Sequence, residues 1–200
     1  MRTRLSKSIF LGAAICFINA SGLTAQTARE PKASSVESSQ LELAITFSAT
    51  RSDVVGGSIF WMQGGGIQTH ALLCRGLGIV ADLSGLHQAN IQSSGVGVDM
   101  VTATFGPRYT WQLAHTRYSF YGQTLAGIAN AFNSEFPANS GVSTDSRGLA
   151  LKFGGGLNVH LSRRIGLRAV EADWLRTQFP NSTTGTQGSL QLSAGFVFLF

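Results

Sequence analysis

Apolar and polar positions alternate strictly at the end of the chain. Every second residue there is apolar, namely Leu190, Leu192, Ala194, Phe196, Phe198 and Phe200. The interleaved positions 189, 191, 193 and 195 are polar or small. A period of two is typical of a β-strand with one apolar face. One such strand proves little in a chain with 44% hydrophobic residues, so the rest of the chain must show the same period.

The same alternation predicts seven further strands. They cover residues 41–50, 59–73, 77–85, 98–113, 117–130, 148–161 and 165–177. In the last of these the phase changes between Leu167 and Val170, which predicts a β-bulge near Arg168. With the terminal strand at 188–200, the pattern predicts an all-β, eight-stranded antiparallel up-and-down barrel whose last strand pairs with its first.

The connections between these strands alternate between long and short. The long ones are residues 51–58, 86–97, 131–147 and 179–187, and the short ones are centred on 75, 115 and 163. Transmembrane barrels have short periplasmic turns and longer extracellular loops. A soluble barrel has no physical reason to obey this asymmetry, so the pattern favours a transmembrane β-barrel.

Composition favours the same class. Charged residues make up 12% of the chain, where a soluble domain carries about 25%. Glycine occurs 24 times, against about 14 from average usage. Beyond residue 25 the only lysines are Lys32 and Lys152. The competing interpretation is a soluble, lipocalin-like ligand-binding barrel, in which the apolar face of each strand would point inward.

The first 40 residues are expected to lie outside the barrel. Residues 1–25 have a basic start and a short apolar core, as in a secretory signal peptide, and residues 26–40 form a polar periplasmic lead-in. Ile15 before Cys16 disfavours lipidation at that cysteine. Removing the signal peptide leaves Cys74 as the only cysteine and a small positive charge, so neither a disulfide nor nucleic-acid binding is expected. Residues 41–200 are the predicted outer-membrane β-barrel.

Several segments resemble known bacterial proteins. Ser193, Gly195, Phe198 and Phe200 resemble the C-terminal signal by which outer-membrane barrels are handed to the barrel-assembly machinery. The eight-strand plan resembles the small barrels of the OmpA/OmpX type. Four segments are similar to an "outer membrane protein beta-barrel domain" family, namely residues 105–109, 154–158, 168–174 and 192–195. The resemblance implies a location in the bacterial outer membrane, in contact with lipid and lipopolysaccharide, and brings no established ligand or activity. We expect a monomer.

Charged residues on the polar faces are expected to fill the lumen. They are Glu42, Asp82, Arg108, Lys152, Glu171 and Asp173. An eight-stranded lumen is just wide enough for side chains, and buried charges need partners, so this set predicts a polar plug. The alternative is a narrow pore for small solutes. Aromatic residues near the strand ends predict two interfacial girdles, formed by Trp61, Tyr109, Trp111, Tyr118, Phe120 and Trp174.

Enzymatic function is not expected. His160, Ser162 and Glu171 resemble the arrangement of outer-membrane lipid A deacylases, but the first two fall beside a short periplasmic turn, on the wrong side for that lipid-modifying chemistry. His70, His87 and His115 lack metal-ligand spacing, and the glycine triplets at 64–66 and 154–156 lack the helix and lysine of a phosphate loop. We therefore expect no metal and no cofactor. The predicted function is a structural or surface-interaction role through the extracellular loops.

Overall fold

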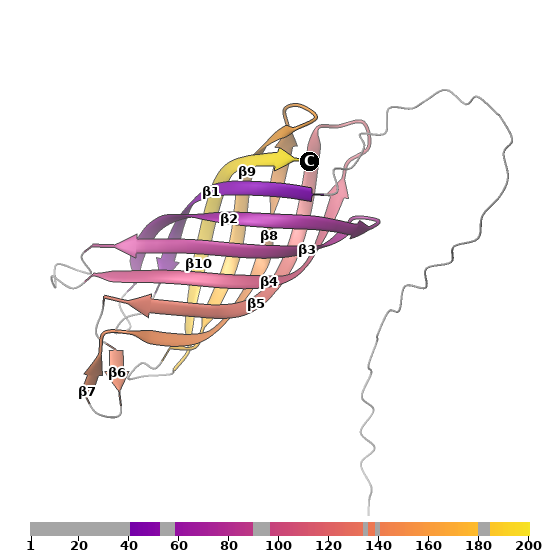
Figure 1. The fold of residues 1–200 in the computed structure, drawn as a ribbon. Coiled ribbons are helices and arrows are strands. Elements are labelled where there is room, and N and C mark those ends of the chain that lie inside the picture. Colours follow the sequence, from indigo (N-terminus) through magenta and orange to yellow (C-terminus); the bar gives the residue numbers. More distant parts are fainter. Residues whose placement is uncertain (1–40, 53–58, 90–96, 134–135, 139–140, 180–184) are drawn as a thin grey trace, which may run out of the picture. The chain divides into compact units, whose positions relative to one another are not determined.

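The computed structural model describes residues 41–52, 59–89, 97–133, 136–138, 141–179 and 185–200. Eight strands form one closed antiparallel barrel in the order β1-β10-β9-β8-β5-β4-β3-β2 (Figure 1). Their bounds are β1 Leu41–Ser52, β2 Phe60–Cys74, β3 Leu77–Gln88, β4 Val98–Gln112, β5 Tyr118–Phe132, β8 Ser146–His160, β9 Ile165–Thr177 and β10 Gln187–Leu199. Two short strands, β6 (Phe136–Ala138) and β7 (Gly141–Ser143), pair with each other in the longest loop. The predicted signal peptide and lead-in lie outside the described residues.

The barrel closes where the sequence predicts. β1 pairs with β10 antiparallel, from Glu42 opposite Leu199 to Arg51 opposite Leu190. All eight predicted strands are confirmed, with ends shifted by a few residues. Closure leaves no strand edge unpaired, which a lipid environment requires because lipid cannot hydrogen-bond to free backbone groups. The described residues contain no helix long and apolar enough to cross a membrane.

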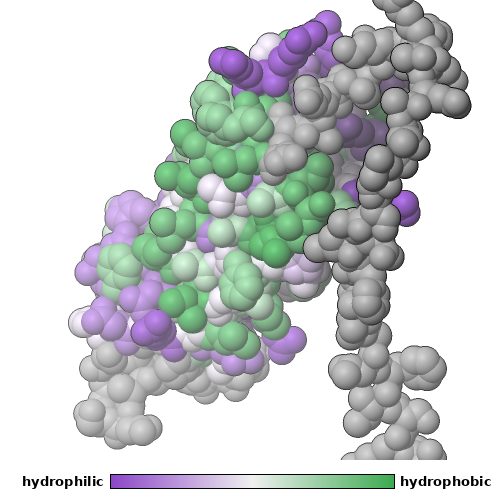
Figure 2. Space-filling view, turned by 45° about the vertical axis from the view of Figure 1, so that its right-hand side comes forward, coloured by the Kyte–Doolittle hydropathy of each residue, from purple (hydrophilic) through white to green (hydrophobic). Residues whose placement is uncertain are grey.

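The apolar face of each strand points outward. Phe47, Phe105, Phe153 and Phe196 are between 52% and 67% exposed on the outer wall. Figure 2 shows, on one side of the barrel, an apolar area between hydrophilic residues at either end. The lipocalin-like alternative, which places these phenylalanines in a central cavity, is therefore wrong.

A β-bulge interrupts β9, as predicted. Glu171 pairs with Ser193 and Arg168 with Gly195, so the bulged strand has one residue more than its partner over this step. Ala169 and Val170 are consecutive and both exposed. The bulge reverses the phase of the strand, so that Arg168 faces the lumen together with Glu171.

Glycines allow the strands to approach closely. A Cβ atom added at Gly154 would lie 2.1 Å from the carbonyl oxygen of Ala172. At Gly195 it would lie 2.0 Å from the carbonyl oxygen of Ile45. Glycine at these positions lets neighbouring strands approach closely, as the tight coiling of a small barrel requires.

The lumen is layered along the barrel. At the long-loop end, buried apolar residues form one cluster, made of Phe60, Met62, Leu86, Val98, Met100, Ala129, Ala131, Ala150, Leu175 and Phe179. Ala44, Val197 and Leu199 form a second cluster near the short-turn end. Charged and amide side chains lie between the two. The inner side of the barrel therefore carries apolar residues beside the predicted charged ones, among them the methionines of β2 and β4.

Candidate functional site: the charged lumen

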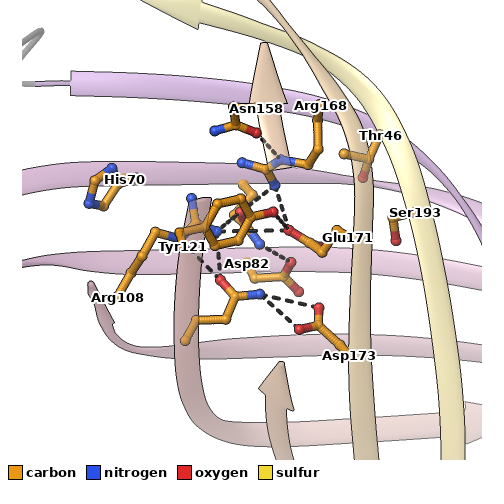
Figure 3. A network of polar contacts seen from close by, with 12 residues as sticks. Thr46, His70, Asp82, Arg108, Tyr121, Asn158, Arg168, Glu171, Asp173 and Ser193 are labelled. Carbon is orange, nitrogen blue, oxygen red and sulfur yellow. Dashed lines mark hydrogen bonds and ion pairs between the residues drawn. The ribbon is translucent and has the colours of Figure 1, made fainter. Parts of the chain in front are cut away.

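The centre of the lumen is organised around the carboxylate of Glu171 (Figure 3). Nη1 of Arg168 lies 2.7 Å from Oε2 of Glu171, and Nη2 of Arg108 lies 3.9 Å from the same oxygen. The hydroxyl of Tyr121 also donates to Oε2. All four residues are less than 5% exposed. One buried carboxylate is thus shared by two guanidinium groups and a phenol.

The ring of Tyr121 stabilises the two arginines in a second way. Cζ of Arg108 lies 4.0 Å from the ring centroid, and Cζ of Arg168 lies 5.0 Å from it. A cation near an aromatic face is stabilised by the ring quadrupole, most strongly where water is excluded. The side-chain oxygen of Gln68 accepts from both arginines, at 2.5 Å from Nη1 of Arg168. These contacts offset the repulsion between two buried like charges.

A second ion pair lies beside the first. Nζ of Lys152 is 2.8 Å from Oδ1 of Asp82, and Gln68 donates to the other oxygen of Asp82 at 3.1 Å. Gln123 accepts from Arg108, at 3.2 Å from Nε, and donates to the Asp173 carboxylate at 3.1 Å. Two glutamines therefore join the charged pairs into one network.

The network continues toward the short-turn end. Asn158 accepts from Nε of Arg168 at 3.2 Å. Nδ1 of His70 lies 3.3 Å from Oε2 of Glu42, without hydrogen-bond geometry. Nη1 of Arg108 has no hydrogen-bond partner among the described residues. Lys152, Asp82, Arg168 and Glu171 are paired, as buried charges must be, whereas the carboxylate of Asp173 is held by the amide of Gln123.

The structure places all six predicted lumen charges on the inner side of the barrel and joins five of them into one network, partly through Gln68 and Gln123. Glu42 stands apart, next to His70. Sequence reasoning missed four members, namely Gln68, Tyr121, Gln123 and Arg168. The two glutamines share the polar phase of their strands and could have been found by that parity. Arg168 could have been found from the predicted bulge.

Hydroxyl pairs line other parts of the inner wall. Ser48 and Ser193 are 2.8 Å apart, and so are Ser52 and Ser189. Both pairs bridge β1 and β10. Ser193 and Gly195 of the predicted insertion signal therefore face inward, whereas Phe200 is 71% exposed. Their role in insertion stays a prediction.

The deacylase-like residues are not assembled. Nδ1 of His160 lies 3.3 Å from the carbonyl oxygen of Arg117, and Oγ of Ser162 accepts from the backbone of Ile165 at 3.1 Å. Glu171 is engaged with Arg168 inside the lumen. The structure thus gives Ser162 a turn-capping contact and brings neither a base nor a carboxylate to it. Within the described ranges, no three His, Cys, Asp or Glu side chains are grouped to hold a metal ion.

The six predicted girdle aromatics all point outward. Each is between 41% and 53% exposed, and Tyr109 and Trp111 stack edge to face with centroids 4.7 Å apart. Their placement at the membrane interface stays a prediction.

A small polar group lies on the outer wall at the long-loop end. Nδ1 of His87 is 2.5 Å from Oδ1 of Asp99, and Asn133 donates to the other oxygen of Asp99. His87 and Asp99 line an open pocket together with Phe132 and Gly85, and a Cβ added at Gly85 would meet nothing within 4 Å. This group was not predicted from the sequence, because its members come from β3, β4 and the residue that follows β5.

Comparison with solved structures identifies the fold. Neisserial surface protein A superposes with a TM-score of 0.60 at 13% identity, covering 81% of this chain and 98% of that chain. Ail, the attachment invasion locus protein of Yersinia pestis, superposes with a TM-score of 0.52 at 16% identity, covering 80% and 99%. No protein-family model matches the sequence, and no curated protein matches it. At these identities the likeness concerns the fold, and the chain has the fold of the small eight-stranded outer-membrane β-barrels.

Proposed function

We propose that this chain is an integral protein of the bacterial outer membrane whose lumen is closed and whose working surface is its long-loop end. The observation that carries the proposal is the combination of an apolar outer wall with a lumen filled by paired charges. A closed lumen leaves the outer surface and the loops as the parts that can meet a partner.

The filling argues against the pore alternative on energetic grounds. An ion crossing the lumen would have to separate paired charges such as Lys152 and Asp82, and breaking a buried pair costs about 3–5 kcal/mol. It would then meet the cluster around Met62 and Met100, whose apolar side chains cannot replace its hydration shell. Both barriers lie in series along the same path.

The long-loop end carries polar side chains on the outer surface, where a partner can reach them, whereas the polar side chains of the lumen are buried. His87, Asp99 and Asn133 present hydrogen-bonding side chains beside an aromatic residue on the outer wall. Ail, one of the similar structures, is named as an attachment invasion locus protein and has also been solved with the heparin analogue sucrose octasulfate. For the present chain we infer the coarser role of surface interaction.

Two measurements test the proposal. Purified protein in a planar lipid bilayer should give no stable single-channel currents, whereas steady open-channel currents would establish the pore alternative. In cells, an epitope tag inserted between residues 139 and 140 should be labelled by antibody without permeabilisation. Labelling only after permeabilisation would reverse the orientation and remove the surface role.

A further inference from the structure

The three short turns of the barrel carry a set of exposed arginines. Arg75 lies between β2 and β3, Arg117 directly precedes β5, and Arg163 and Arg164 lie between β8 and β9. None of the four forms an ion pair with any side chain in the described part of the barrel. We call these four residues the arginine collar.

The backbone of each turn is fixed to the neighbouring strand. The amide of Thr110 donates to the Gly76 carbonyl at 2.8 Å, and the amide of His160 donates to the Arg117 carbonyl at 2.8 Å. The amide of Leu199 donates to the Arg164 carbonyl at 2.9 Å. The three turns therefore hold the collar at fixed positions around the rim, and the seam between β1 and β10 separates the first turn from the last.

The collar lies directly beside the lipid-facing wall. Exposed apolar side chains flank the turns, namely Leu73, Leu77, Leu113, Leu161 and Ile165. The turns extend only one or two residues beyond these positions, and an extended residue advances the chain by about 3.3 Å. The headgroup region of a bilayer is about 5–7 Å thick on each side. In the proposed orientation, the turns would therefore lie within reach of the lipid phosphates.

We propose that the arginine collar binds the phosphate groups of anionic phospholipids in the periplasmic leaflet. A guanidinium presents a planar fork of donors that matches phosphate geometry, and its full charge persists at all physiological pH values. An anionic polymer of the periplasm is disfavoured as the partner, because turns this short do not carry the side chains beyond the headgroups. The assignment to the periplasmic leaflet rests on the proposed orientation.

The test uses the folded full-length barrel in phosphocholine micelles. Short-chain phosphatidylglycerol is titrated in, and amide chemical shifts are followed by NMR at Gly76, Arg117 and Arg164. Phosphatidylcholine of the same chain length, inorganic phosphate and a soluble peptidoglycan fragment are titrated separately. Two variants are compared, R75Q/R117Q/R163Q/R164Q and the matched control R51Q/R147Q/R176Q, whose outward-facing arginines lie at the long-loop end. Heat-modifiable migration on a gel verifies that each variant is folded.

Phosphatidylglycerol should shift the turn amides saturably, with an affinity at least about five-fold above that of phosphatidylcholine, as expected from the gain of a single basic residue at an anionic surface. The collar variant should lose this difference and the control variant should keep it. The proposal would be overturned if both lipids shifted the turn amides equally, or if the collar variant bound phosphatidylglycerol as the wild type does. It would also be overturned if inorganic phosphate saturated the same shifts with the same affinity as phosphatidylglycerol. Tighter binding of the peptidoglycan fragment than of the lipid would overturn it in favour of a cell-wall partner. The wild-type lipid comparison decides the matter even if a variant fails to fold.

Discussion

Arg168 and Glu171 are three residues apart in one strand, yet their side chains meet inside the lumen with 2.7 Å between Nη1 and Oε2. In a regular strand, residues at this separation point to opposite faces. The bulge at Ala169 and Val170 removes that opposition, because both of these residues face outward in succession. A local irregularity of the backbone thus creates the ion pair at the centre of the network.

The shared carboxylate predicts a large effect on stability. Glu171→Ala leaves Arg108 and Arg168 without their common anion, and the free energy of unfolding should fall by about 3–5 kcal/mol. Urea unfolding in lipid vesicles, followed by tryptophan fluorescence, measures this. The exposed Arg147→Gln should change the free energy by no more than about 0.5 kcal/mol. A loss at Glu171 as small as that of the control would mean that water compensates the arginines.

The bulge predicts an effect of register. Deleting Ala169 should make β9 regular and leave Arg168 and Glu171 two positions apart, so both side chains should still face the lumen. The deletion variant should therefore keep its heat-modifiable gel migration. Deleting Ala126, in the regular strand β5, should abolish that migration, because the residues on one side of the deletion turn to the opposite face. Loss of migration on deleting Ala169 would show that the barrel needs the extra residue in β9.

Two glycines on the barrel wall form a matched pair. An alanine at Gly154 places its Cβ 2.1 Å from a backbone oxygen of β9, whereas at Gly85 it meets nothing within 4 Å. Gly154→Ala should lower the free energy of unfolding by about 1–3 kcal/mol, and Gly85→Ala should leave it unchanged or slightly raised. Urea midpoints of the two variants provide the comparison. Equal midpoints would indicate that the strands move apart at negligible cost.

The ion pair between Lys152 and Asp82 predicts that substitutions of the two residues have strongly coupled effects on stability. Lys152→Met alone and Asp82→Leu alone should each lower the free energy of unfolding by about 3–5 kcal/mol, because each leaves a buried charge unpaired. The double variant should recover most of this loss, since it removes both charges. A double-mutant cycle measures the coupling, and additive losses would show that the two residues do not depend on each other.

The sequence alone determined the strands, their number and which face of each strand is apolar. Alternation of apolar and polar residues is a local signal, and strands such as Leu41–Ser52 and Gln187–Leu199 carry it over most of their length. The alternation of long and short connections indicated an up-and-down barrel whose long loops all lie at one end. The phase change near Arg168 was also a local signal, and it located the bulge.

Only the tertiary structure decided which polar side chains meet. Glu171, Tyr121, Gln68 and Arg108 come from four strands, and their contacts depend on the stagger of every ladder between them. A shift of register by two residues would keep each side chain on its face and give it different partners. The apolar cluster at the long-loop end could not be predicted for the same reason, because the alternation assigns a residue to the inner face without assigning its depth along the barrel.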